Sequence, residues 1–296
     1  MHPFLERLST GPMVSSGAVG TVLQAKVLRP VKTLEEYNLT DPEAVAEIHR
    51  AYVDAGAEMI GTNSFGANPL KLKKVGLEDK AFDLNYQAAR IARRAAPRGV
   101  FVFAALGPSG EFLTPLGTID PEEMYSAYRT VVVAAAEGGA DILSLRTFSD
   151  LEEMRIALRA AKENTDLPVI ATMTFDLGQK GFRTMMGVDV ETAIAGMVGA
   201  GAEVIGSNCG RGMEEMLPLM KEMRARYPGY LTAQPNAGLP ELVDGRAKYT
   251  QSPEDFASWV TSLLEAGVDI IGGCCGTTPA HTRRVAEEVR RFGAGN

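Results

Sequence analysis

The three cysteines are the residues whose type and spacing point most directly to chemistry. Cys274 and Cys275 are adjacent and lie between Gly273 and Gly276, whereas Cys209 stands far earlier in the chain and also precedes a glycine. Adjacent side chains on a straight strand point to opposite faces, so such a pair can reach one target only where glycine lets the backbone turn sharply. We therefore interpret the three cysteines as thiolate ligands of one zinc ion, with the open fourth position that is typical of a catalytic site.

Two other interpretations of the cysteines stay open at this point. Free cysteine is among the most buried residue types, so all three could simply pack in the core. Cys274 and Cys275 could also form a vicinal disulfide. No CxxC pair is present, so spacing alone does not decide. The setting favours the metal, because each cysteine site follows a short apolar run and precedes a glycine, which is typical of a loop at a strand end.

Composition limits the classes of function. The chain has 296 residues, of which 45% are hydrophobic, so it can bury a large core. A net charge of −7 argues against a nucleic-acid partner. Three cysteines do not make a disulfide framework, which favours a cytoplasmic protein. No signal-peptide pattern and no membrane-spanning apolar run of about 20 residues is evident, so we expect no membrane association.

Short β-branched runs alternate with longer amphipathic runs along the whole chain. The alternation predicts a single-domain α/β fold, a (β/α)8 TIM barrel over residues 1–296. An open doubly wound sheet is the second choice, but no GxGxxG motif follows the first strand. The long loop 17–41 is predicted to carry substrate contacts. The predicted strands are residues 13–15, 59–62, 100–106, 142–145, 169–174, 204–207, 230–233 and 270–272. The predicted helices are residues 42–55, 78–95, 121–137, 150–163, 190–199, 213–226, 253–266 and 279–292.

A short motif recurs before every second predicted strand. Each copy has a glycine that would end a helix, a small or β-branched residue and then an acid. Evenly spaced joints of this kind are typical of a barrel built from repeated units. The copies are residues 55–61, 138–143, 200–206 and 266–272.

In a (β/α)8 barrel, functional residues gather at the C-terminal ends of the strands. The cysteines follow the sixth and eighth predicted strands, and residues from alternate strands meet in one layer, so the barrel would bring the three sulfur atoms together. The candidate substrate-binding residues at other strand ends are Ser16, Gly17, Thr62, Asn63, Arg146 and Asn236. Phe65 and Phe148 could form walls of the pocket or pack in the core. None of the three histidines lies at a strand end, so we expect structural roles for them.

Four motifs resemble those of the homocysteine S-methyltransferase family over essentially the whole chain. They are residues 61–68, 208–210, 235–240 and 273–277, and residues 235–240 look most like the cobalamin-dependent methionine synthase branch. The resemblance implies a zinc-dependent methyltransferase of methionine biosynthesis, with Zn²⁺ on Cys209, Cys274 and Cys275. It also implies that Asn236 is the fourth ligand when no thiol is bound. Coordination would deprotonate a thiol, whose free pKa is about 8.5, and the thiolate would attack a methyl group.

The chain departs from the family pattern at two strand ends. The family has an aspartate where Ser16 stands and a glutamate where Arg146 stands, and these carboxylates face the ammonium group of homocysteine. We hypothesise that the acceptor carries a carboxylate or sulfonate at this place, because a guanidinium binds such anions in a bidentate way. The alternative is that Arg146 pairs with Asp176 or Glu111 and that homocysteine binds through other groups.

Three functions therefore compete. The first is methyl transfer to a zinc-bound thiol(ate), with homocysteine or a related mercapto-acid as acceptor. The second is the methyltransferase component of a corrinoid-linked demethylation system, and the third is a non-catalytic zinc-binding or ligand-binding homologue. The sequence shows no cobalamin or pterin domain, so we expect a small-molecule methyl donor or a separate corrinoid protein to bring the methyl group.

Overall fold

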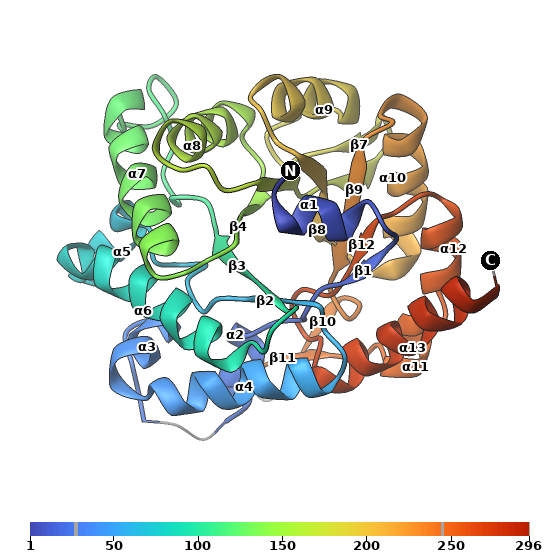
Figure 1. Cartoon of the computed structure of the whole chain (residues 1–296). Coiled ribbons are helices and arrows are strands. Elements are labelled where there is room, and N and C mark those ends of the chain that lie inside the picture. The colour runs from blue at the N-terminus through green and yellow to red at the C-terminus, as the bar shows by residue number, and fades with distance from the viewer. Residues whose placement is uncertain (27–28, 244–245, 296) are drawn as a thin grey trace.

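The computed structural model is a barrel of parallel strands surrounded by helices (Figure 1). It describes residues 1–26, 29–243 and 246–295, so residues 27 and 28 of the predicted loop 17–41 lie outside the described residues. The 8-stranded sheet has the order β1-β12-β9-β8-β5-β4-β3-β2, and a parallel bridge from Ser15 to Met59 joins β1 to β2. This closure confirms the predicted (β/α)8 barrel. The strands are β1 Met13–Val14, β2 Met59–Gly61, β3 Phe101–Leu106, β4 Ile142–Phe148, β5 Val169–Met173, β8 Val204–Cys209, β9 Tyr230–Pro235 and β12 Ile270–Ile271.

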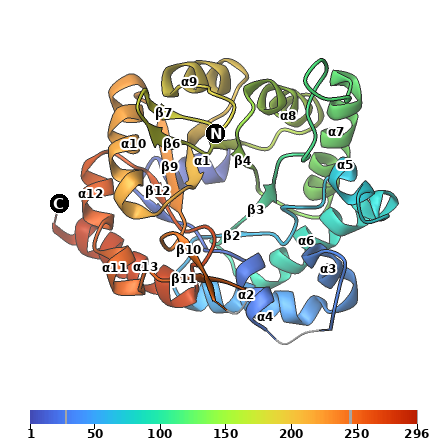
Figure 2. The ribbon, with the colours of Figure 1, turned by 180° about the vertical axis from the view of Figure 1, so that it is seen from behind.

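Helices follow the strands and form the outer layer (Figures 1 and 2). Several begin at an aspartate whose side chain accepts a hydrogen bond from a backbone N–H of the first turn, as at Asp41, Asp120 and Asp189. The main outer helices are α4 Pro42–Asp54, α6 Ala81–Ala95, α7 Pro121–Glu137, α8 Leu151–Asn164, α9 Val190–Gly199, α10 Met213–Arg226, α11 Pro253–Ala257, α12 Val260–Glu265 and α13 Pro279–Gly295. Within the described residues, no helix is both long and apolar enough to cross a bilayer.

Most predicted helix boundaries lie close to those in the structure, but two of the predicted helices are interrupted. The helix predicted over residues 78–95 begins as a separate turn, η2 Glu78–Lys80, and the one predicted over residues 253–266 divides into α11 and α12. The loop predicted over residues 17–41 contains short helices of its own. The remaining short helices are α2 Gly20–Ala25, η1 Leu34–Glu36, α3 Tyr37–Thr40 and α5 Pro69–Lys73.

Helix α1 (Pro3–Leu8), which the sequence did not predict, lies across one end of the barrel (Figure 1). Phe4 and Leu8 of this helix are buried in one cluster with residues near the strand starts, among them Met13 and Met59. Burial of such apolar side chains seals this end of the barrel. The opposite end, where the strands finish, is left for a functional site.

The recurring motif has the same structural role in each of its four copies. The glycine of each copy has a positive φ, between 81° and 97°, which is a conformation that glycine adopts without strain. The acid accepts a hydrogen bond from a backbone N–H near the start of a neighbouring strand and pairs with a basic side chain. The four sets are Glu58 with Val14 and Arg7, Asp141 with Val102 and Arg93, Glu203 with Val169 and Lys162, and Asp269 with Leu231 and Arg224.

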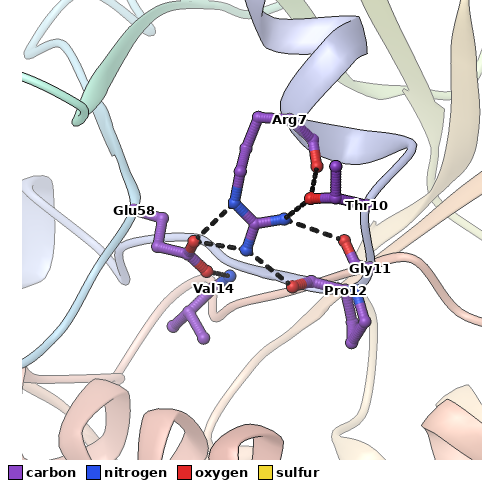
Figure 3. A network of polar contacts seen from close by, with 6 residues as sticks. All are labelled: Arg7, Thr10, Gly11, Pro12, Val14 and Glu58. Carbon is purple, nitrogen blue, oxygen red and sulfur yellow. Dashed lines mark hydrogen bonds and ion pairs between the residues drawn. The ribbon is translucent and has the colours of Figure 1, made fainter. Parts of the chain in front are cut away.

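Figure 3 shows the first of these sets. Arg7 donates from Nε to Glu58 Oε1 at 3.0 Å, and its other nitrogens donate to the carbonyl oxygens of Gly11 and Pro12. Glu58 Oε2 accepts from the Val14 N–H at 3.1 Å. The network therefore fastens α1 and the short strand β1 to the start of β2.

We expect Glu58→Gln to lower the free energy of unfolding by about 1–2 kcal/mol, because the Arg7 guanidinium loses its anion and a charge-assisted hydrogen bond. Glu43→Gln is the matched control, since Glu43 pairs with Arg50 on the exposed surface. The control should change stability by less than about 0.5 kcal/mol. Urea unfolding of both variants measures the difference, and equal losses would contradict the role assigned to Glu58.

Three of the strands extend further than predicted at the end of the barrel opposite α1. β4 continues to Phe148, β8 to Cys209 and β9 to Pro235, whereas the predicted ends were residues 145, 207 and 233. Two unpredicted hairpins follow β5 and β9 (Figure 2), formed by β6 Asp176–Gly178 with β7 Gly181–Arg183 and by β10 Pro240–Val243 with β11 Arg246–Tyr249.

Candidate metal centre and adjoining cavity

The three cysteines converge at the C-terminal ends of β8 and β12. Their Sγ atoms all lie within 4.8 Å of one another, and the Sγ atoms of Cys209 and Cys274 are 3.3 Å apart. Tetrahedral zinc with bonds of about 2.3 Å would place its sulfur ligands about 3.8 Å apart. All three cysteines are free, so no vicinal disulfide is formed. The donor set therefore fits one tetrahedral ion.

The backbone around the sulfur atoms is held by neighbouring loops. Cys209 has a φ of 64°, which is unusual for a residue with a side chain, and it ends β8 with a sharp turn. The Cys274 N–H donates to the Pro235 carbonyl at 2.7 Å, and the Ala237 N–H donates to the Cys275 carbonyl at 3.0 Å. The chain leaving β9 therefore fixes the cysteine pair that follows β12.

The cluster favours one thiolate even before a cation is considered. Hydrogen bonds from Cys209 and Cys275, together with the positive charge of Arg146 and a hydrogen bond from Asn208, hold the pKa of Cys274 well below its usual value. Hydrogen bonding with Cys274 and Cys275 and burial raise the pKa of Cys209. A divalent cation would have to displace the protons that remain, as metal coordination does for thiols.

Asn236 has an unpartnered oxygen beside the cluster loops. Its Nδ2 donates to the Gly210 carbonyl at 2.7 Å, whereas its buried Oδ1 has no hydrogen-bond partner within the part of the chain that the structure describes. Buried polar atoms normally have a partner, so an unpaired oxygen is consistent with a missing ligand or ion. The assignment of Asn236 as fourth ligand stays a prediction.

Asn208 connects the end of β4 to the sulfur cluster. Its Oδ1 accepts from the Thr147 N–H at 2.8 Å and from the Thr172 hydroxyl at 2.6 Å. Its Nδ2 donates to Thr147 Oγ1 at 2.7 Å and lies 3.6 Å from Cys274 Sγ. The sequence placed Asn208 in a motif but gave it no role, because these contacts join segments that are distant in the chain.

A cavity of about 280 Å³ adjoins the three cysteines, and all three belong to its lining. Apart from one cationic and one acidic side chain, its walls are apolar or neutral. The other lining residues are Gly17, Ala18, Val19, Gly20, Thr21, Leu34, Glu35, Gly61, Thr62, Asn63, Ser64, Phe65, Phe103, Ala105, Arg146, Thr147 and Gly273. The long loop after β1 therefore contributes to the cavity.

The polar groups of some predicted substrate-binding residues are hydrogen-bonded to the backbone of neighbouring segments. Thr62 Oγ1 accepts from the Ala105 N–H at 3.0 Å, and Asn63 Nδ2 donates to the Leu34 carbonyl at 2.9 Å. Ser16 is buried but is not among the lining residues, and its Oγ accepts from the Gly61 N–H at 3.1 Å. The substrate-binding roles of these residues stay predictions.

Gly17 lies where the backbone passes close to the cysteine turn. A Cβ at this position would stand less than 3.0 Å from the side-chain oxygens of Thr277 and Tyr52. Gly17 therefore permits close packing at the cavity wall, because any other residue would push the loop outward.

Arg146 lines the cavity near the end of β4, where the pairing with β5 shifts register between Leu145 and Phe148. Such a bulge re-aims side chains, and Thr147 has a φ of 67° there. The alternative pairing of Arg146 with Glu111 or Asp176 is wrong. Glu111 pairs with Lys74 at 2.8 Å, Asp176 lies on the exposed strand β6, and neither makes an ion pair with Arg146 within the described residues.

The aromatic residues divide between cavity and core. Phe65 lines the cavity, whereas Phe148 is fully buried and its ring centroid is 6.0 Å from that of Tyr128.

None of the three histidines lines the cavity. His49 is buried in α4, and burial lowers its pKa to about 4.

Tyr249 was not predicted as part of the site. It ends β11 and its ring packs on Gly276, where a Cβ would stand less than 3.0 Å from three of its atoms. Burial and the neighbouring Cys275 raise the pKa of its phenol. The sequence carried no signal for this contact, because the hairpin that delivers Tyr249 was not predicted.

The family model described as Homocysteine S-methyltransferase matches residues 13–289, which is nearly the whole chain. The chain belongs to the homocysteine S-methyltransferase family. It is 33% identical to the methionine synthase of Mycobacterium tuberculosis and 32% identical to that of Mycobacterium leprae, with 96% and 98% of this chain aligned. The chain spans 25% of the length of each of these family members.

Solved structures of the family agree with the fold. The metallated form of the homocysteine methyltransferase MmuM from Escherichia coli superposes with a TM-score of 0.80 at 22% identity, covering 96% of this chain and 99% of that one. At this identity the superposition supports the barrel architecture, and the match of the family model confirms the resemblance inferred from the motifs.

Proposed function

We propose that this protein is a zinc-dependent methyltransferase that methylates the sulfur of a thiol acceptor. The observation that carries the proposal is the cluster of Cys209, Cys274 and Cys275, whose Sγ atoms lie within 4.8 Å of one another at the wall of a cavity. Membership of the homocysteine S-methyltransferase family supports the reaction class. Zinc, when bound, would supply a Lewis acid that keeps the acceptor sulfur deprotonated at neutral pH.

The residues of the chain have separate tasks in this proposal. The three cysteines would hold the ion, and Asn236 Oδ1 would be the candidate for the remaining position in the absence of a thiol. Asn208 orients the Cys274 sulfur through its amide. The apolar cavity positions the acceptor and limits the access of water, which strengthens electrostatic contacts inside it. No side-chain base is needed, consistent with the absence of histidine from the lining residues.

The methyl group comes from a second molecule in this proposal. The mycobacterial methionine synthases are about four times as long as this chain, which aligns with 25% of each. A small methyl donor or a separate corrinoid protein would then bring the methyl group to the cavity. A cytoplasmic location fits the three free cysteines.

Metal analysis and thiol binding test the proposal together. The protein, purified under reducing conditions, should contain about one zinc per chain, as expected for one site with three cysteine ligands. Thiol binding at pH 7 should release protons, which calorimetry in buffers of different ionisation enthalpy measures. Transfer of a labelled methyl group from methylcobalamin or a sulfonium donor then identifies the donor class. A reduced protein without metal, or a zinc-loaded protein that binds no thiol, would overturn the proposal.

A further inference from the structure

The cavity contains a buried cation that has no carboxylate partner within the described residues. Arg146 is only 8% exposed and makes no ion pair within the residues that the structure describes. Glu35 is the acidic residue in the cavity lining, and its oxygens are engaged by the Gly66 N–H at 2.6 Å and by the Thr33 hydroxyl. Burying a charge is costly unless it is paired, and the negative groups near the guanidinium are the cysteine cluster and any anion that enters the cavity.

The guanidinium is oriented by neutral groups. One of its amino nitrogens donates to Gln234 Oε1 at 2.7 Å, and Gln234 in turn donates to Thr232 Oγ1 at 3.2 Å. Its central carbon lies 5.7 Å from the ring centroid of Phe103. These contacts fix the plane of the guanidinium without neutralising its charge. The rest of its fork of N–H donors stays available for a planar carboxylate or a sulfonate.

The cysteine cluster provides a competing explanation. Three thiolates around a divalent ion carry one net negative charge, which Arg146 could balance from a distance. The hydrogen bond to Cys274 Sγ, however, comes from Asn208, and no hydrogen bond from Arg146 to sulfur is present in the described part of the chain. Arg146 also borders the cavity itself, where an acceptor would lie. The two explanations predict different responses to a change at Arg146.

Building on the proposed function, we propose that Arg146 makes this site selective for an acceptor thiol that carries a carboxylate or sulfonate and no ammonium group. The acceptor is then a mercapto-acid and not an amino-acid thiol. The anion binds the guanidinium while the sulfur binds at the cysteine cluster. An ammonium group in the same place would face the fixed like charge of Arg146, which disfavours binding.

A matched set of thiols tests this selectivity without a methyl donor. Homocysteine has both charged groups, 4-mercaptobutyrate lacks the ammonium, 3-mercaptopropylamine lacks the carboxylate and 3-mercaptopropanol lacks both charges. Calorimetric titration of the zinc-loaded protein gives a dissociation constant for each. We expect 4-mercaptobutyrate to bind at least about tenfold more tightly than 3-mercaptopropylamine, because a charge-assisted hydrogen bond contributes enough binding free energy for such a difference. We also expect it to bind more tightly than homocysteine.

Variants of Arg146 separate selectivity from charge balance. In Arg146→Gln the advantage of 4-mercaptobutyrate over 3-mercaptopropanol should disappear, and in Arg146→Glu the amine should become the preferred ligand. Arg155→Gln is the control, because Arg155 is exposed on α8 and pairs with Glu152. The control should keep the wild-type order of affinities.

Three results would overturn the inference. The first is a wild-type protein that binds homocysteine more tightly than 4-mercaptobutyrate. The second is an equal loss for all four thiols in Arg146→Gln, which would assign Arg146 to charge balance of the cluster. The third is a zinc-loaded wild-type protein that binds none of the thiols, which would overturn the proposed function as well. In the first two cases thiol binding itself persists, so the proposed function stands.

Discussion

Cys274→Ala is expected to remove the metal and with it all thiol binding, while the barrel stays folded. The Sγ atom of Cys274 is 3.3 Å from that of Cys209, and within the described residues the cluster of possible metal ligands consists of the three cysteines, so no fourth residue of the cluster replaces Cys274. Changes in outer partners of metal ligands already cost about 10–100-fold in affinity, and loss of a ligand should exceed about 100-fold. Competition with a chromophoric chelator measures the zinc affinity of the reduced protein.

Cys209→Ala and Cys275→Ala serve as the comparison. All three alanine variants should lose zinc, because each removes one of the three sulfur ligands. Circular dichroism should show wild-type secondary structure in each. If Cys275→Ala kept wild-type zinc affinity, Cys275 would not be a ligand and the three-sulfur site would be refuted.

Gly276→Ala should combine a loss of stability with a weaker metal site. Gly276 has a φ of 81°, and a Cβ there would stand less than 3.0 Å from three atoms of Tyr249. The matched control is Gly76→Ala, because Gly76 has a φ of 66° and nothing within 4 Å of the added Cβ. The control should cost about 1 kcal/mol of backbone strain. Gly276→Ala should cost about 2–4 kcal/mol, since steric overlap is added to the strain.

Urea unfolding and zinc affinity of both glycine variants measure the two effects. Only Gly276→Ala should weaken zinc binding, because Tyr249 would be displaced from its place beside Cys275. Adding Tyr249→Ala to the Gly276→Ala background should recover part of the lost stability, which a double-mutant cycle quantifies. Indistinguishable losses for Gly276→Ala and Gly76→Ala would show that the packing of Tyr249 on Gly276 is unimportant.

Local patterns in the sequence were enough to predict the barrel. Strands and helices alternate with clear hydrophobic periods. The same short motif recurs before four strands, because its acid accepts a hydrogen bond from a backbone N–H of a neighbouring strand in each copy. These acids are Glu58, Asp141, Glu203 and Asp269. The convergence of Cys209 with the Cys274–Cys275 pair followed from barrel geometry alone, since strand ends of a closed sheet meet at one face.

Individual hydrogen bonds and packing contacts between side chains of distant segments were not predictable. The hydrogen bond of Arg146 to Gln234 joins residues 88 positions apart, and that of Thr147 to Asn208 joins residues 61 positions apart. The hairpin that brings Tyr249 to Gly276 is short, and its strands have no strong alternation. Helix α1 is a single short segment whose two buried residues, Phe4 and Leu8, find their partners only in the folded barrel.

The placement of the sulfur ligands has a mechanical consequence. Cys209 and Cys274 are 65 positions apart, and between β8 and β12 in the sheet lies only β9. An ion held there would act as a removable cross-link that closes a long loop of the unfolded chain, much as a disulfide does. Chelation should therefore loosen the last third of the barrel first, and proteases should cut between these two cysteines sooner in the metal-free protein.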